Sequence, residues 1–281
     1  MYLLQNKPIK TYCRFVMIQV MNADRGQKSR TRKTTAVLAV VLGLAVVVLI
    51  ACVGYHIYQR PLHDLLNYPV YGGMNDELKD SELFEDMQSG RSICFIGDSI
   101  TYGFNNEGIP WYEPLVPYIR GEILALSFSG WKTSDLIANG DKIPSADIYV
   151  VAIGVNDVIH FDSDSVDAAD AEEYREDLEQ LSGIVLGISP DAKLYFVAPW
   201  PFFYEFERVE NRADLYCETL EEWCDESGYI YIDPNPFILP IVEEDGLSKY
   251  SDDGLHPNAP DGVGLYSYAV LIAEHDRRMQ N

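Results

Sequence analysis

CFIGDSITYG, residues 94–103, places Gly97-Asp98-Ser99 directly after a run of apolar residues. Gly, Asp and Ser are common turn formers, so the triplet can be an ordinary turn at the end of a strand. It can also be a serine exposed at the carboxyl end of a parallel strand, where open α/β sheets bind their ligands. The residues that follow the other predicted strands decide between these two interpretations.

Apolar runs typical of strands alternate with helical patterns over residues 91–281. The predicted strands are 92–96, 122–128, 147–153, 193–198 and 229–232. Between them, apolar residues recur every three or four positions, as on the buried face of an amphipathic helix, over 174–188 and 209–224, and a last helical run covers 263–279. Strands that alternate with helices predict a parallel five-stranded sheet with helices on both faces.

Four of the loops that follow these strands carry residue types suited to chemistry. Ser99 follows the first strand, Gly130 in SFSGWKT the second, and Asn156 in GVNDV the third, while Asp253 and His256 in DDGLHPN come after the fifth. Because the carboxyl ends of parallel strands share one edge of a sheet, we expect these groups to converge. Each motif alone is common turn chemistry, but their shared position favours one site over four unrelated turns.

These motifs resemble those of the SGNH/GDSL hydrolases, which are serine esterases with a flavodoxin-like three-layer α/β/α fold, over roughly residues 91–276. The resemblance implies that Ser99 of GDSIT is the nucleophile and that Asp253 and His256 of DGLHPN complete a triad. It also implies an oxyanion hole made by the amides of Ser99 and Gly130 and the side chain of Asn156. SFSGWKT departs from the Asn-x-Gly or Gly-x-Thr patterns that the family often has around this glycine.

The chemistry of an ester hydrolase needs these residue types. A serine hydroxyl is a weak nucleophile until a neighbouring base such as His256 takes its proton. A carboxylate then orients the imidazole and stabilises its charged form. Asp253 and Asp252 are the two candidates for this carboxylate, and a spacing of three residues before His256 favours Asp253. We expect neither a metal ion nor a cofactor, because the histidines do not have metal-ligand spacing.

Aromatic residues near the predicted site suggest a substrate-binding wall. PWPFFYEFERVENR, residues 199–212, follows the fourth strand, and Trp200 and Phe203 in it, with Trp131 beside Gly130, are the candidates. They can form a sugar platform or an acyl pocket, or pack as core. We expect the substrate to be an O-acetyl ester on an extracellular glycan. A lysophospholipid or short-chain lipid ester, acetyl transfer through the same serine, and a glycan-binding module with a relic site are the alternatives.

The charge of the chain is divided unevenly along its length. The sequence has 21 Lys and Arg against 44 Asp and Glu, but residues 1–33 contain eight of the basic residues and one acidic residue. The remainder is therefore strongly acidic, which disfavours binding to nucleic acid and to anionic lipid headgroups.

Residues 34–58 contain no Lys, Arg, Asp or Glu. A helix of this length is about 37 Å long, enough to span a ~30 Å hydrocarbon core. The basic residues before it predict that residues 1–33 are cytoplasmic and that everything after the span is extracellular. We therefore expect a single-pass anchor in the cell membrane, a stalk over 59–90 and a hydrolase domain over 91–281. LIAC, residues 49–52, leaves lipoprotein cleavage at Cys52 as an alternative, and Met17 or Met21 as the start is another.

Overall fold

The computed structural model describes residues 78–159, 168–201 and 210–280, together with Val41, Gly43 and Val46. In chain order the elements are α4 (Glu82–Gln88), β1 (Ile93–Gly97), α5 (Ser99–Tyr102), the 3-10 helix η2 (Glu113–Tyr118), β2 (Ile123–Ser127), α6 (Thr133–Ala138), η3 (Gly140–Lys142), β3 (Ile148–Ala152), α7 (Val155–Ile159), α8 (Ala168–Ile188), β4 (Lys193–Val197), α9 (Glu210–Ser227), β5 (Ile230–Ile232), α10 (Asn235–Asp245), η5 (Leu247–Lys249) and α11 (Asp261–Gln280).

The strands form one parallel sheet in the order β2-β1-β3-β4-β5. This is the strand order of flavodoxin-like folds, in which the chain reverses direction across the sheet beside β1. The register aligns Ile96 of β1 with Leu126 of β2 and with Val151 of β3. The predicted five-stranded parallel sheet is therefore confirmed, with each strand within two residues of its predicted bounds.

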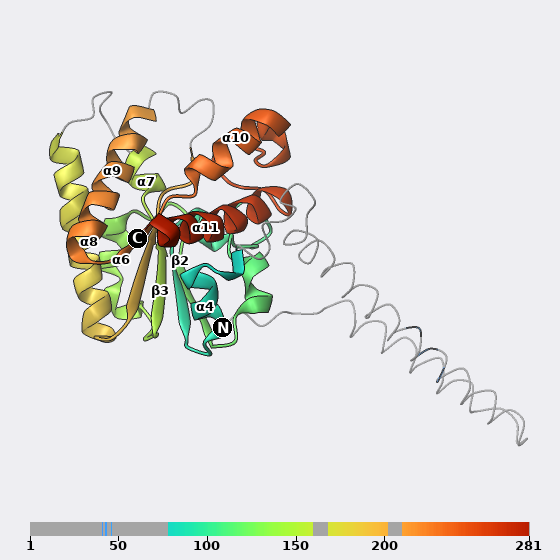
Figure 1. Cartoon of the computed structure of the whole chain (residues 1–281), viewed down its shortest axis with the longest axis horizontal. Helices are drawn as coiled ribbons and strands as arrows, with labels where there is room; N and C mark the ends of the chain where they lie inside the picture. The colour runs from blue at the N-terminus through green and yellow to red at the C-terminus, as the bar shows by residue number, and fades with distance from the viewer. Residues whose placement is uncertain are drawn as a thin grey trace, which may run out of the picture. The chain divides into compact units, whose positions relative to one another are not determined.

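Helices cover both faces of the sheet and form two separate apolar cores (Figure 1). Phe95 and Val150 face the core made with α4, η2, α10 and α11, whereas Cys94 and Val151 face the core made with α6, α8 and α9. Alternate residues of one strand point to opposite faces, so a strand covered on both sides must be apolar at every position. This explains why β1 and β3, which are buried along their whole length, are continuous apolar runs.

The helical periodicities mark the buried faces. Tyr174, Leu178, Leu181 and Val185 of α8 are all buried in one core, as their spacing predicts. Helix α11 differs from this amphipathic pattern, because every residue from Gly262 to Glu274 is buried. It lies across one face of the sheet and contacts α4, α10, β5 and η2.

The folded domain begins earlier than the predicted boundary at residue 91. Helix α4 lies within the predicted stalk, yet its Leu83 and Met87 are fully buried in the core beside α11. The carboxylate of the buried Glu274 on α11 accepts hydrogen bonds from the backbone N–H groups of Glu82 and Leu83 at the start of α4, and it pairs with Arg277 at 2.9 Å. These contacts make α4 an integral part of the domain.

The chain separates into two units, residues 1–60 and 61–281. Val41, Gly43 and Val46 of the first unit are helical, and the rest of the predicted 34–58 anchor lies outside the described residues. Of the helices in the described ranges, none has the length and apolar character needed to cross a membrane.

Candidate active site

Ser99 lies at the first turn of α5, directly after β1. Gly97 has no room for a side chain, because a Cβ there would lie 2.2 Å from Thr101 Oγ1 and 2.3 Å from the carbonyl oxygen of Ala152. Asp98 caps the short helix by accepting a hydrogen bond from the Ile100 N–H at 3.0 Å. The Gly-Asp-Ser triplet is thus a tight turn that fixes the position of the serine against the end of β3.

The loop before α11 holds His256 in one orientation. Its Nδ1 lies 2.8 Å from Asp253 Oδ2, and its backbone N–H donates to Asp253 Oδ1 at 2.7 Å. Ser251 Oγ donates to the His256 carbonyl at 2.7 Å and accepts from the Gly254 N–H at 3.0 Å. Of the two candidate carboxylates, Asp253 is the one that the structure places in contact with the imidazole.

Hydrogen bonds keep the Asp253 carboxylate ionised. Partial burial acts to raise its pKa, but donation from the backbone and ring of His256, from the Leu255 N–H and from Asn105 outweighs burial and lowers the pKa well below its usual range. An ionised carboxylate at this position orients the ring through Nδ1 and stabilises its protonated form.

The loop and the nucleophile turn meet through one side-chain contact. His256 Nε2 lies 3.0 Å from Ser99 Oγ, within hydrogen-bond reach. Ser99, His256 and Asp253 therefore form an uninterrupted chain of hydrogen bonds, with Ser99 itself buried and its partner ring mostly so. This arrangement can activate a serine hydroxyl by transferring its proton to the imidazole.

The loops after β2 and β3 are joined by two polar contacts. Asn156 Nδ2 donates to the carbonyl of Trp131 at 2.9 Å, and the carboxylate of Asp157 accepts from the Thr133 N–H at 3.1 Å. Only one of the two Asn156 amide protons is used by the carbonyl, so the other can bind a ligand. Gly130, in the same loop, has a φ of 80°, a left-handed conformation that favours glycine. Two of the three predicted oxyanion residues, Gly130 and Asn156, thus lie on two segments that are joined by hydrogen bonds.

Two neighbours of the site were not predicted from the sequence. Asn105 donates from Nδ2 to Asp253 Oδ2 at 2.9 Å, and the ring of Phe104 lies 5.2 Å from the ring of His256. Both follow α5 in GFNNEG, a loop whose only sequence signal is its turn-forming composition. Asn105 has a φ of 58°, a conformation that Asn adopts more readily than most residues.

The predicted aromatic wall is only partly at the site. Trp131 is half-buried and stacks on Phe128 with ring centroids 4.8 Å apart. Trp200 is fully buried and packs edge-on against Tyr266 of α11, so its assignment as a substrate contact was wrong. Trp200 belongs to the core that β4 and α11 share. Phe203 lies outside the described residues.

Two buried carboxyl groups lie behind the serine. Burial raises the pKa of Asp98 to about 7; the hydrogen bond from Ile100 opposes this shift and the charge of Asp157 adds to it. Burial likewise raises the pKa of Asp157 to about 6, against the lowering effect of the bonds from Thr133. Asp98 Oδ2 has no hydrogen-bond partner in the described part of the chain, and the residue lines a small cavity with Ile153, Trp200 and Tyr266. In the same ranges, no three His, Cys, Asp or Glu side chains are grouped as a metal site.

Several solved structures have a fold similar to that of this domain. The domain is similar to a protein from Parabacteroides merdae described as a GDSL-like lipase, with a TM-score of 0.57 and 19% identity over 67% of this chain and 97% of that one. It is similar to an acetylxylan esterase from Geobacillus stearothermophilus, with a TM-score of 0.53 and 19% identity over 67% and 95% of the two chains. It is also similar to an α/β hydrolase from the metagenome of Lake Arreo, with a TM-score of 0.52 and 21% identity over 66% of this chain and 95% of that one. The comparison with curated proteins yields no match.

A parallel sheet with a hydrogen-bonded Ser-His-Asp chain at its carboxyl edge defines a serine hydrolase. Residues 95–260 match the sequence profile of the GDSL-like lipase/acylhydrolase family, which is more than half of the chain. The protein belongs to this family, and it is a serine ester hydrolase.

Because Asp98 is buried, we expect it to make the free energy of unfolding depend on pH. Its raised pKa means that between about pH 4 and pH 7 the folded state holds a proton that the unfolded chain has lost. The contribution of Asp98 to stability is therefore largest at low pH and is lost as the pH rises through about 7. Asp98→Asn mimics the protonated acid and keeps an oxygen that accepts from Ile100, so its melting temperature relative to wild type should rise from pH 5 to pH 8.

Thermal unfolding of the two proteins across this pH range measures the difference. Asp252→Asn is the matched control, because Asp252 is exposed. A difference between Asp98→Asn and wild type that does not change with pH would contradict the assignment.

Proposed function

We propose that this protein removes O-acetyl groups from an extracellular glycan, with Ser99 as the nucleophile. The observation that carries the proposal is the chain of hydrogen bonds from Ser99 Oγ through His256 to Asp253, at 3.0 and 2.8 Å. His256 takes the hydroxyl proton as Ser99 Oγ attacks the ester carbonyl, and Asp253 stabilises the imidazolium that results. The imidazolium then gives this proton to the departing sugar oxygen. The sugar is released, and the acetyl group remains bound to Ser99 Oγ.

Water completes the reaction by the reverse use of the same groups. His256 removes a proton from a water molecule, whose oxygen attacks the acetyl carbonyl; acetate leaves and the proton returns to Ser99 Oγ. Both steps pass through a tetrahedral intermediate with a negatively charged oxygen. The backbone N–H groups of Ser99 and Gly130 and the free proton of Asn156 Nδ2 are the donors we assign to that oxygen. One such donor typically contributes ~3–4 kcal/mol to the transition state.

Three observations favour a small acyl group on a neutral carbohydrate. Similar folds include an acetylxylan esterase. The acidic body disfavours the anionic headgroups that a lysophospholipase would meet at a membrane surface. In addition, the exposed rings of Tyr102 and Phe128 form an aromatic surface beside the helix of Ser99. The intact hydrogen-bonded chain also disfavours a binding module with a relic site.

Acetate release tests the substrate class. We expect release from at least one of partially O-acetylated xylotetraose, mannotetraose and chitotetraose, with kcat/KM above that for a lysophospholipid. Turnover of ethyl acetate without release from any of the three would contradict a glycan substrate while leaving the esterase assignment intact.

The proposed location is the outer face of the cell membrane, with residues 34–58 as the anchor. It rests on the uncharged apolar run and on the eight basic residues that precede it. Protease added to intact cells should release an active fragment containing residues 78–281. Complete protection until the cells are lysed would refute this orientation.

Substitutions separate the proposed roles of the site residues. Ser99→Ala should abolish hydrolysis of p-nitrophenyl acetate, and Asn156→Ala should lower kcat by ~10²–10³ with little change in KM, because its amide acts mainly in the transition state. Asp253→Ala should also be strongly impaired. Asp252→Ala is the matched control and should be mild. Wild-type turnover by Ser99→Ala, or equal losses in the two aspartate variants, would be incompatible with these roles.

A further inference from the structure

Three aromatic side chains form a continuous row next to the nucleophile turn. The rings of Tyr102 and Phe128 lie 6.0 Å apart with an interplanar angle of 17°, and those of Phe128 and Trp131 lie 4.8 Å apart at 25°. We call Tyr102, Phe128 and Trp131 the aromatic row. Its members come from two separate parts of the chain, the end of α5 and the loop after β2, so the row is a product of the fold and not of one local segment.

The aromatic row is open to solvent. Tyr102 is 48% exposed and Phe128 is 53% exposed, whereas most aromatic side chains of the described domain are buried in the two cores. Single exposed apolar residues are ordinary on protein surfaces, but adjoining ones beside a functional site are typical of a binding surface. The row therefore requires an explanation beyond packing.

Covalent and polar links tie the aromatic row to the reacting groups. Tyr102 is three residues after Ser99 in the same short helix. At the other end of the row, the carbonyl of Trp131 accepts the 2.9 Å hydrogen bond from Asn156 Nδ2. The row is thus joined at one end to the helix of the serine and at the other to the side chain that we assign as an oxyanion donor.

We propose that the aromatic row is a platform for the pyranose rings of a neutral glycan, next to the acetylated sugar. This inference rests on the proposed function and adds to it the residues that select the carbohydrate. A pyranose ring can place its C–H groups on an aromatic face while its hydroxyl groups stay in water, which suits rings that are half open to solvent. The hydroxyl of Tyr102 adds a polar group that can donate to a sugar oxygen.

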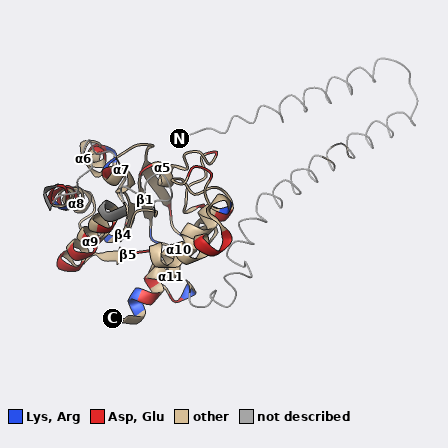
Figure 2. Cartoon of the chain, turned by 90° about the horizontal axis from the view of Figure 1, so that it is seen from above, with Lys and Arg blue, Asp and Glu red and all other residues tan. Residues whose placement is uncertain are grey.

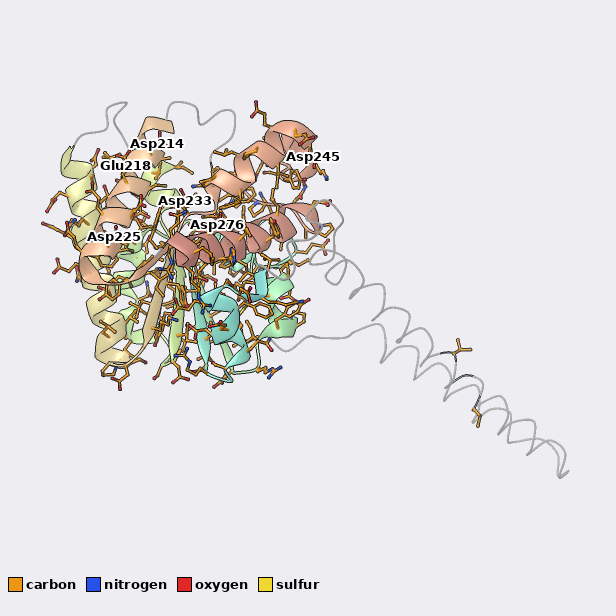
Figure 3. The ribbon with its side chains drawn as sticks, viewed as in Figure 1. Asp214, Glu218, Asp225, Asp233, Asp245 and Asp276 are labelled. Atoms are coloured by element: carbon orange, nitrogen blue, oxygen red, sulfur yellow. The ribbon has the colours of Figure 1, made fainter. Side chains whose placement is uncertain are left out.

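An acyl chain fits the aromatic row less well. Burial of a CH₂ group stabilises a complex only when the group leaves water, and an open row covers an acyl chain on one side only. Charge favours a neutral ligand as well, because acidic side chains are abundant on α9 and α10 (Figure 2). Figure 3 labels four of these acids, Asp214, Glu218 and Asp225 on α9 and Asp245 on α10, and also Asp233 before α10 and Asp276 on α11. An acidic surface of this kind repels anionic sugars and anionic lipids.

Steady-state kinetics of the full-length protein test the platform. The two substrates are ethyl acetate, which has no sugar ring, and whichever of the three partially O-acetylated tetrasaccharides the wild type hydrolyses with the highest kcat/KM. Phe128→Ala and Tyr102→Ala should each raise KM for the oligosaccharide and lower the ratio of the two kcat/KM values by about tenfold, the loss that corresponds to one aromatic contact.

Conservative variants distinguish a ring contact from simple apolar bulk. Phe128→Tyr should keep the wild-type ratio, whereas Phe128→Leu, which keeps apolar volume but has no ring, should lose it as Phe128→Ala does. Leu239→Ala is the matched control for an exposed apolar side chain, since Leu239 is 46% exposed on α10, and it should leave both activities unchanged.

Three outcomes overturn the platform. The first is an unchanged ratio of the two kcat/KM values in Phe128→Ala and Tyr102→Ala. The second is full oligosaccharide activity in Phe128→Leu. The third is a larger loss of turnover with ethyl octanoate than with the oligosaccharide in Phe128→Ala, which would assign the row to an acyl chain. Failure of the proposed function is distinguishable, because it would be seen in the wild type alone as hydrolysis of ethyl acetate without acetate release from any of the three tetrasaccharides.

Discussion

The 3.0 Å contact between His256 Nε2 and Ser99 Oγ joins two parts of the chain that are 157 residues apart in sequence. Both residues depend on the sheet for their position. Ser99 follows β1, where Gly97 permits a close approach to β3, and His256 precedes α11, whose length is buried against the sheet and its helices. Displacement of either element by 1 Å would lengthen this contact beyond hydrogen-bond range, so the packing of the sheet determines whether the serine can be activated.

Supporting contacts restrict the side chains of the site further. Asn105 and the backbone of the last loop hold the Asp253 carboxylate, which in turn holds the imidazole. After β3, Asn156 and Asp157 of α7 bind the backbone of Trp131 and Thr133, close to Gly130 in the chain. The Asp253 carboxylate, the His256 imidazole and the Asn156 amide are thus each positioned by a second polar group. This arrangement suits groups that must be in place before charge develops in the transition state.

The fold and the central residues of the site could be predicted because their signals are local. Strands buried on both faces are continuous apolar runs, and Gly-Asp-Ser and Asp-x-x-His are short motifs at strand and loop ends. The sequence does not place helix α4 in the domain, because α4 has only seven residues and its buried positions include the charged Asp86 beside Leu83 and Met87, which does not make a clear apolar periodicity. Phe104 and Trp200 could not be placed, because the exposure of an aromatic side chain depends on tertiary contacts that the sequence does not encode locally.

The central claim is that Ser99 is a nucleophile activated by His256, and active-site labelling tests it most directly. The full-length protein is treated with a fluorophosphonate, digested, and mapped by mass spectrometry. The account predicts one phosphonate adduct, on the peptide that contains Ser99, and its loss in His256→Ala or after denaturation. An adduct on another residue of the folded protein, or labelling of Ser99 that persists without His256, would contradict the account.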